Sequence, residues 1–169
     1  MTGWGTNNVA RAGIIAALYA ALTITLAPIS YGVYQVRIAE ALTVLPFVYP
    51  AAIPGLWLGC LIANIFGGNG LPDIVGGSLC TLLAAWLTYL TSRIDNLRVG
   101  IALAPLPPVI VNAFGVAAYL SGITGMSYLF VVQMIGLGQL VACYVLGIPL
   151  LLYLIYRRPG IIEQRGKNG

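Results

Sequence analysis

Long apolar runs, separated by short polar or glycine-rich stretches, make up most of the chain. We expect six helical segments, at residues 12–29, 37–52, 55–66, 74–92, 99–120 and 127–156. An α-helix needs about 20 mostly apolar residues to cross the core of a bilayer. The second and third segments are near the lower limit of that length, and they could merge differently at Pro50 and Pro54. The pattern predicts an all-α fold, an integral membrane bundle of six transmembrane helices.

Composition supports a membrane protein. The 169 residues are 60% hydrophobic and 7% charged, and the mean hydropathy is +0.95. A soluble domain has about 25% charged residues, because water must solvate its surface. The first apolar run is longer than a signal-peptide core and lacks a convincing cleavage site, so we interpret it as a transmembrane helix. We expect a single transmembrane domain over residues 1–169, with multiple passes through a prokaryotic plasma membrane.

The basic residues predict the orientation of the chain. If the N-terminus is cytoplasmic, seven of the eight basic residues lie on the inner side, namely Arg11, Arg93, Arg98, Arg157, Arg158, Arg165 and Lys167. Arg37 alone would lie outside. Because Arg and Lys concentrate in cytoplasmic loops, we expect an even number of spans with both termini in the cytoplasm. The formal net charge of +4 belongs to these anchors, so we do not expect nucleic-acid binding.

Glu40 is the most informative residue of the chain. It follows Arg37 by three residues, at the outer start of the second segment. A carboxylate at membrane depth is costly and by default marks a functional site that contains a partner. The alternative is a helical Arg37–Glu40 pair, which contributes little. We favour ligand contact by Glu40, with Arg37 orienting the carboxylate or itself contacting the ligand.

Other polar residues extend this candidate site. Asp73 either caps the following helix or binds ligand, and the two roles are compatible. Amides inside the spans also need partners, and there are four of them: Asn64, Asn112, Gln133 and Gln139. They fit a shared polar pocket, and hydrogen bonds between helices are the alternative. Glycine-rich stretches at 30–36, 67–73 and 121–125 predict a lidded pocket that opens outward, unless they are merely tight connectors.

The first helix carries small residues in a regular pattern. They recur every four positions at Ala12, Ala16 and Ala20, and Gly13, Ala17 and Ala21 lie beside them. Small residues at this spacing let helices approach closely. The stripe of Ala12, Ala16 and Ala20 packs either within the bundle or against a partner protein, and spacing alone does not decide between them.

The chain carries no motif for catalysis or metal binding. It has no His, no Walker loop, no HExxH and no GxSxG. The isolated Cys60, Cys80 and Cys143 fit buried small hydrophobes better than disulfides or metal ligands. We therefore expect no catalytic residue, metal or cofactor. Two further classes remain open: a membrane-embedded enzyme with Glu40 or Asp73 as general base, and a scaffold subunit that binds no small molecule.

Three features resemble the QueT family of queuosine-precursor transporters, which are S components of energy-coupling factor (ECF) transporters. They are residues 34–46 (YQVRIAEALTVLP), residues 64–70 (NIFGGNG) with the following Asp73, and the alanine stripe. The resemblance implies a six-helix protein that binds a micronutrient from outside and topples in the membrane to release it. It also implies three partners, a transmembrane coupling protein and two cytoplasmic ATPases. Ala12, Ala16 and Ala20 would contact the coupling protein.

The resemblance also implies a cargo, one of the 7-deazaguanines preQ1, preQ0 or queuine. A guanine edge offers adjacent N–H donors that a carboxylate accepts, and we assign this role to Glu40. The exocyclic oxygen needs a donor, for which the candidates are Asn64, Asn112, Gln133 and Arg37. The ring needs an aromatic platform, for which the candidates are Tyr31, Tyr34, Tyr119 and Tyr128. Asp73 would attract an aminomethyl cation. An S component for riboflavin, folate or biotin is the alternative.

Overall fold

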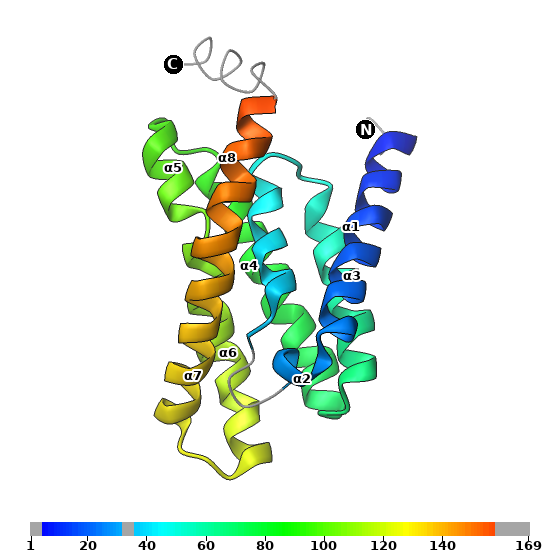
Figure 1. Cartoon of the computed structure of the whole chain (residues 1–169), viewed down its shortest axis with the longest axis vertical. Helices are drawn as coiled ribbons and strands as arrows, with labels where there is room; N and C mark the ends of the chain where they lie inside the picture. The colour runs from blue at the N-terminus through cyan, green and yellow to red at the C-terminus, as the bar shows by residue number, and fades with distance from the viewer. Residues whose placement is uncertain (1–4, 32–35, 158–169) are drawn as a thin grey trace.

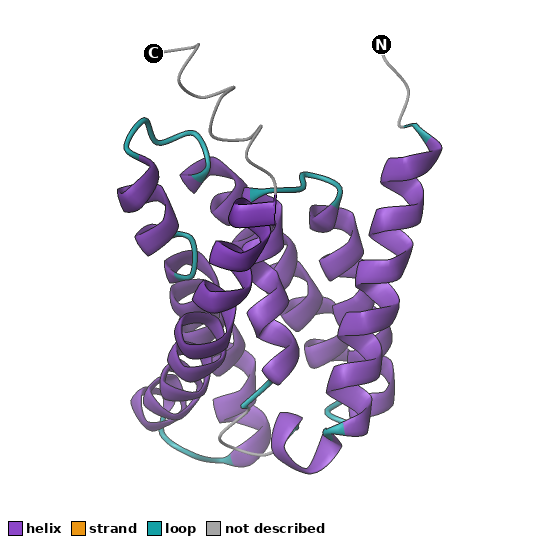
Figure 2. Ribbon diagram, turned by 45° about the horizontal axis from the view of Figure 1, so that its top comes forward, coloured by secondary structure: helices purple, strands orange, loops and turns teal. Residues whose placement is uncertain are grey.

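The computed structural model describes residues 5–31 and 36–157, and in these residues it contains helices and connecting loops but no strand (Figures 1 and 2). The α-helices are α1 (Thr6–Thr25), α2 (Ala27–Ser30), α3 (Ala52–Gly67), α4 (Ser78–Thr91), α5 (Leu97–Leu103), α6 (Leu106–Thr124), α7 (Tyr128–Leu140) and α8 (Ile148–Arg157). A 3₁₀-helix, η1 (Ile38–Phe47), and two π-helices, η2 (Asp73–Gly77) and η3 (Val141–Gly147), complete the set. The all-α prediction is confirmed for this part of the chain.

Four continuous helical stretches are long and apolar enough to cross a membrane: Thr6–Thr25, Asp73–Thr91, Leu97–Thr124 and Tyr128–Arg157. Two shorter apolar helices, Ile38–Phe47 and Ala52–Gly67, correspond to the second and third expected segments. Each expected segment is therefore present as an apolar helix in the described residues. Six complete crossings stay a prediction, since two of the helices are short.

Three of the long stretches contain irregular turns. The α5 helix ends at Leu103 and α6 begins at Leu106, with Pro105 between them. A proline inside a helix lacks the N–H that the preceding turn needs and interrupts it. The π-helices η2 and η3 are continuous with the α-helices beside them, and such wide turns often occur at functional sites.

The start of α1 and the end of α8 lie at the same end of the bundle, together with α5 (Figure 1). Arg11 lies near the start of α1, Arg98 near the start of α5, and Arg157 at the end of α8. These three basic residues thus gather at one end, which agrees with a positive-inside distribution. That this end faces the cytoplasm stays a prediction.

The short helix η1 runs through the middle of the bundle (Figure 1). All residues from Ala39 to Phe47 are buried, and η1 packs against α1, α3, α4, η3 and α8. Since protein surrounds this helix, it can carry polar groups that would be costly against lipid. Glu40 lies in its first turn.

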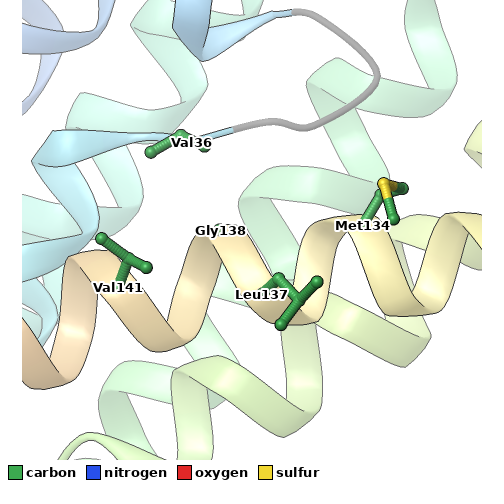
Figure 3. A pocket seen from close by; sticks show the side chains of 5 residues that line it. All are labelled: Val36, Met134, Leu137, Gly138 and Val141. Atoms are coloured by element: carbon green, nitrogen blue, oxygen red, sulfur yellow. The ribbon is translucent and has the colours of Figure 1, made fainter.

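Three hollows on the outside of the bundle are lined mainly by apolar side chains. One, of about 230 Å³, lies between the start of η1 and helix α7 and is lined by Val36, Met134, Leu137, Gly138 and Val141 (Figure 3). A second is lined by Ile53, Leu79, Leu82, Leu83 and Trp86. The third is lined by Arg11, Ile14, Ile15, Leu45 and Tyr49.

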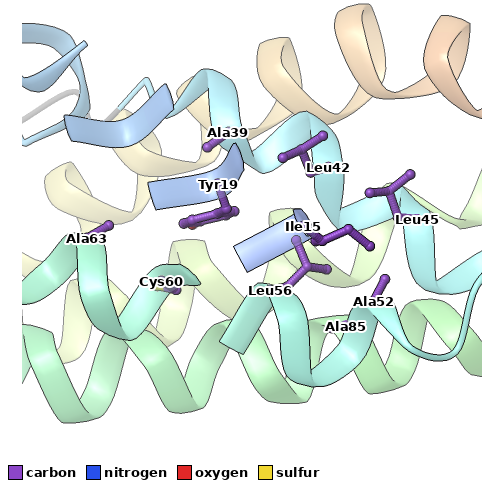
Figure 4. Packing of buried hydrophobic residues seen from close by; sticks show 10 residues of the cluster. All are labelled: Ile15, Tyr19, Ala39, Leu42, Leu45, Ala52, Leu56, Cys60, Ala63 and Ala85. Carbon is purple, nitrogen blue, oxygen red and sulfur yellow. The ribbon is translucent and has the colours of Figure 1, made fainter. Parts of the chain in front are cut away.

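Helices α1 and α3 approach closely at two glycines. A Cβ atom on Gly55 would lie 2.7 Å from the Ala12 carbonyl oxygen, and one on Gly59 would lie 2.7 Å from that of Ala16. Ala12, Ala16 and Ala20 are buried, and Tyr19 of the same face packs among apolar residues of the core (Figure 4). The alanine stripe therefore packs within the bundle. Its spacing left open packing within the bundle or against a partner protein, and the structure shows packing within the bundle.

Candidate functional site

Polar side chains from five elements meet beside the first turn of η1. We define this polar cluster as Tyr19 of α1, Arg37 and Glu40 at η1, Cys60 and Asn64 of α3, Asp73 of η2, and Asn112 and Tyr119 of α6. Except for Tyr119, which is partly buried, its members are buried. Residues more than 90 positions apart in the sequence therefore share one polar centre inside an apolar bundle.

Glu40 accepts hydrogen bonds from two helices. Its side chain is 1% exposed. Tyr19 donates its hydroxyl to Oε1, and Asn112 donates from Nδ2 to Oε2 over 3.2 Å. Both donors are neutral, so they satisfy oxygen atoms of the carboxylate without cancelling its charge.

Arg37 pairs with Asp73. Its Nη2 atom lies 3.6 Å from Oδ2 of Asp73, and this is the one salt bridge found among residues 5–31 and 36–157. The Nε atom donates to the carbonyl oxygen of Ser30 over 3.3 Å, and the guanidinium lies 5.5 Å from the centre of the Tyr31 ring. The alternative of an Arg37–Glu40 helical pair is thus wrong, because Arg37 turns to a residue of η2.

Asp73 is fully buried and has several partners. Tyr119 donates its hydroxyl to Oδ1 over 2.5 Å, and Asn69 donates from Nδ2 to Oδ2 over 2.9 Å. Asp73 does not cap the following helix: it is the first residue of η2, and no side chain caps that helix. Its carboxylate is occupied by Tyr119, Asn69 and Arg37, so it holds the outer part of the cluster together.

Cys60 and Asn64 of α3 connect Asp73 to α4. The Cys60 thiol is free and buried, and its Sγ atom accepts hydrogen bonds from Thr81 over 3.2 Å and from Asn64 over 3.4 Å. Asn64 also donates to the backbone carbonyl of Asp73 over 2.8 Å. We expected Cys60 to be an apolar filler, but it serves as a hydrogen-bond acceptor. The other two cysteines are also free thiols, as predicted.

Gly77 makes room for this arrangement. A Cβ atom at that position would lie 2.8 Å from Nδ2 of Asn64, 2.9 Å from Oδ1 of Asp73 and 3.0 Å from the hydroxyl oxygen of Tyr119. Real Cβ contacts are essentially never this short. Three members of the cluster therefore depend on a glycine in the last turn of η2.

Several buried polar atoms in and beside the cluster have no hydrogen-bond partner among the described residues. These atoms are Oγ of Ser30, Nη2 of Arg37, Oδ1 of Asn64 and Oδ1 of Asn112. Leaving such an atom unpaired costs about 1–3 kcal/mol. The cluster thus offers two amide oxygens that accept, one guanidinium nitrogen that donates, and a hydroxyl that does either.

Not every predicted site residue joins the cluster. Gln133 is exposed on α7, and Tyr128 is 41% exposed and donates its hydroxyl to the carbonyl of Phe114. Gln139, by contrast, is buried beside the cluster: its side chain lies next to that of Glu40, and its Oε1 accepts from the Cys143 thiol over 3.5 Å. Tyr34 lies outside the described residues. The prediction that all four amides share one pocket is therefore wrong for Gln133, which is exposed.

Tyr31 lies next to the cluster without entering its hydrogen-bond network. Its hydroxyl donates to the carbonyl of Ala63 over 2.5 Å, and Gly67 packs against its ring. The ring faces the Arg37 guanidinium. It thus remains a candidate platform for a planar ligand next to Arg37.

Tyr19 is the main contact that sequence reasoning missed. It lies on the same helix face as the alanine stripe and is completely buried. A buried tyrosine hydroxyl normally has a hydrogen-bond partner, so a tyrosine in the middle of an apolar helix was a signal for a polar neighbour. None of the three outer hollows is lined by a member of the polar cluster, although Val36 and Gly138 directly precede Arg37 and Gln139.

Comparison with known proteins supplies the family. The sequence profile of the QueT transporter matches residues 9–156, which is most of the chain. Searches of curated proteins and of solved structures gave no match. The matched range includes every residue of the polar cluster, and the long apolar helices agree with a multi-pass membrane protein. The chain therefore belongs to the QueT transporter family, a family of S components of ECF transporters.

Proposed function

We propose that this chain is the substrate-binding S component of an ECF importer and that it captures a queuosine precursor for ATP-driven uptake. Membership of a transporter family supports transport rather than catalysis. The observation that carries the proposal is the group of buried polar atoms around Glu40 that lack a hydrogen bond, at Arg37, Asn64 and Asn112. The Glu40 carboxylate among them can accept further hydrogen bonds besides those from Tyr19 and Asn112.

The donors and acceptors of a 7-deazaguanine suit this group. Its guanine-type edge carries N–H donors next to an acceptor oxygen. Each carboxylate oxygen accepts more than one hydrogen bond, so Glu40 can receive ring N–H groups while it keeps Tyr19 and Asn112. The amide oxygens of Asn64 and Asn112 would accept further N–H donors, and Nη2 of Arg37 would donate to the exocyclic oxygen.

The structure changes the role that we propose for Asp73. Its carboxylate already has partners in Tyr119, Asn69 and Arg37. We therefore assign Asp73 to positioning Arg37, and we no longer expect it to bind an aminomethyl cation. This leaves preQ1, preQ0 and queuine as candidates, with riboflavin, folate or biotin as the alternative cargo.

Ligand-dependent stabilisation of the purified protein tests the proposal. The panel consists of preQ1, preQ0, queuine, guanine, riboflavin, folate and biotin, each added to the protein in detergent. A ligand at 100 times its Kd stabilises the native state by about 2.7 kcal/mol, which raises the melting temperature. We expect stabilisation by at least one deazaguanine. Stabilisation by a vitamin alone would support the alternative cargo, and no response to any compound would contradict the role as a small-molecule binder.

We also propose a coupling face on α1 that differs from the expected one. Because Ala12, Ala16 and Ala20 are buried in the bundle, they are not available to a partner. The neighbouring residues Gly13, Ala17 and Ala21 are exposed, and no atom lies within 4 Å of a Cβ placed on Gly13. These three residues, spaced by four, form the stripe that a helix of the coupling protein can approach closely.

A further inference from the structure

Arginine–tyrosine pairs mark the end of the bundle where α1 begins and α8 finishes. Arg93 lies over the ring of Tyr89 with 4.9 Å to its centre, and Arg157 lies over Tyr153 at 5.5 Å. Each of these pairs is formed by residues four positions apart. Tyrosine and arginine are typical anchors at the boundary between membrane and water. This end therefore lies near lipid head groups.

A third pair differs because it joins two separate segments. Arg11 of α1 lies over the ring of Tyr49, which follows η1, with 5.4 Å to the ring centre. Arg11 forms no salt bridge with any residue that the structure describes. No carboxylate among these residues therefore neutralises the stacked guanidinium, and the N–H groups on its edge are suited to an anion.

The Arg11–Tyr49 pair stands at the rim of a hollow of about 250 Å³. The remaining lining residues are Ile14, Ile15 and Leu45. Ile14 is 67% exposed, so the hollow opens on the outer surface of the bundle, which faces lipid in a membrane-spanning protein. It combines one cation with an otherwise apolar or aromatic wall.

We propose that this hollow binds an anionic phospholipid, with the phosphate at the Arg11 guanidinium and part of an acyl chain against Ile14, Ile15 and Leu45. Charge complementarity favours this occupant, because basic pockets between transmembrane helices bind anionic head groups. The planar guanidinium matches the oxygens of a phosphate group. The site is separate from the polar cluster, since no cluster residue lines it.

Lipid retention by the purified chain tests the head-group contact. The protein is exchanged into mixed micelles that contain phosphatidylglycerol and phosphatidylcholine with identical acyl chains, and bound lipid is counted by native mass spectrometry. We expect the original chain to retain about fivefold more phosphatidylglycerol than phosphatidylcholine. In Arg11→Gln this preference should fall below about twofold. Arg98→Gln is the matched control, because Arg98 is exposed at the same end but does not line the hollow. Equal losses in both variants, or equal binding of both lipids by the original chain, would overturn the proposal.

A second variant tests the acyl-chain contact. Ile14→Trp fills the hollow and leaves Arg11 in place, whereas Leu18→Trp adds the same bulk one turn further along the exposed surface. We expect only Ile14→Trp to reduce phosphatidylglycerol retention by at least about threefold, and inorganic phosphate not to compete. Competition by free phosphate, or unchanged retention in Ile14→Trp, would contradict a lipid. The assay contains neither cargo nor partner proteins, so its outcome is independent of the proposed transport function.

Discussion

At the residue scale, the charge of Glu40 is the central property of the polar cluster. Tyr19 and Asn112 give the carboxylate two neutral donors, and the buried cation Arg37 is directed to Asp73. A ligand that presents N–H groups therefore meets an acceptor that is both buried and negatively charged. Charge-assisted hydrogen bonds of this kind are about twice as strong as neutral ones.

Glu40→Gln tests this view with little change in side-chain shape. Removing the charged acceptor should weaken binding of the deazaguanine by about 2 kcal/mol or more, which is roughly a 30-fold rise in Kd. Isothermal titration with the purified variant measures the effect. Asp95→Asn is the control, because Asp95 is an exposed acid outside the cluster and its substitution should leave Kd unchanged. An unchanged affinity in Glu40→Gln would remove Glu40 from the site.

Gly77→Ala should disturb the cluster through its neighbours. The new methyl group would collide with Asn64, Asp73 and Tyr119, and such overpacking costs about 1–3 kcal/mol. We expect a lower melting temperature and weaker ligand binding. Gly122→Ala adds the same methyl group where nothing lies within 4 Å, so its melting temperature should stay the same or rise. Equal behaviour of the two variants would contradict the close packing at Gly77.

The sequence predicted part of this site because charge is a strong signal in an apolar chain. Glu40, Arg37 and Asp73 stand out at once, and they do lie together in the structure. Tyr19 and Cys60 did not stand out, because a hydroxyl or a thiol in an apolar helix leaves the hydropathy almost unchanged. Which charged groups pair with each other also depends on how η2 packs against η1, which no local pattern in the sequence reveals.

At the element scale, α1 carries two stripes of small residues with the same spacing. Spacing by four predicts that a face permits close approach, but it does not say what approaches. The buried stripe lies against Gly55 and Gly59 of α3, and the exposed stripe begins at Gly13. Both stripes are equally regular in the sequence, so spacing could not show which one is exposed. The stripe chosen for the partner contact is the one that the structure places inside the bundle.

Ala17→Leu separates the two stripes by experiment. Ala17 is exposed, so the larger side chain should leave folding and ligand affinity unchanged while it blocks approach of the coupling protein. Co-purification with the coupling protein and the two ATPases should therefore be lost. Retention of the complex in Ala17→Leu would place the coupling face elsewhere.

Gly59→Ala is the complementary variant, since it acts on the buried stripe. The added methyl group would lie 2.7 Å from the Ala16 carbonyl oxygen and 2.8 Å from Cβ of Tyr19. We expect it to separate α1 from α3 and to lower the melting temperature of the isolated chain. Gly13→Ala, which places a methyl group in open space, should not do so.

At the scale of the whole molecule, hydropathy predicted the apolar helices well. Each expected segment matches a described helix or a run of helices, because a membrane span must be both long and apolar. The helix types were not predicted: the pattern of apolar residues does not distinguish an α-helix from the 3₁₀ turns of η1 or the π turns of η2 and η3. Those choices depend on tertiary packing.

Reporter fusions test the orientation of the bundle. With both termini in the cytoplasm, as the distribution of arginine and lysine predicts, green fluorescent protein at the C-terminus should fluoresce and alkaline phosphatase there should be inactive. The reverse result is expected for fusions made after Gly125, in the connection between α6 and α7. Active phosphatase at the C-terminus would contradict the predicted orientation.

The winding of η1 changes how far this short helix extends along its axis. Its 10 residues form a 3₁₀-helix, which rises about 2.0 Å per residue and so extends for about 20 Å. An α-helix of the same number of residues would extend for about 15 Å. Against a hydrocarbon core about 30 Å thick, the tighter coil covers roughly two thirds of the distance instead of half. A segment that is too short to cross as an α-helix thereby leaves a much smaller gap for the surrounding protein to close.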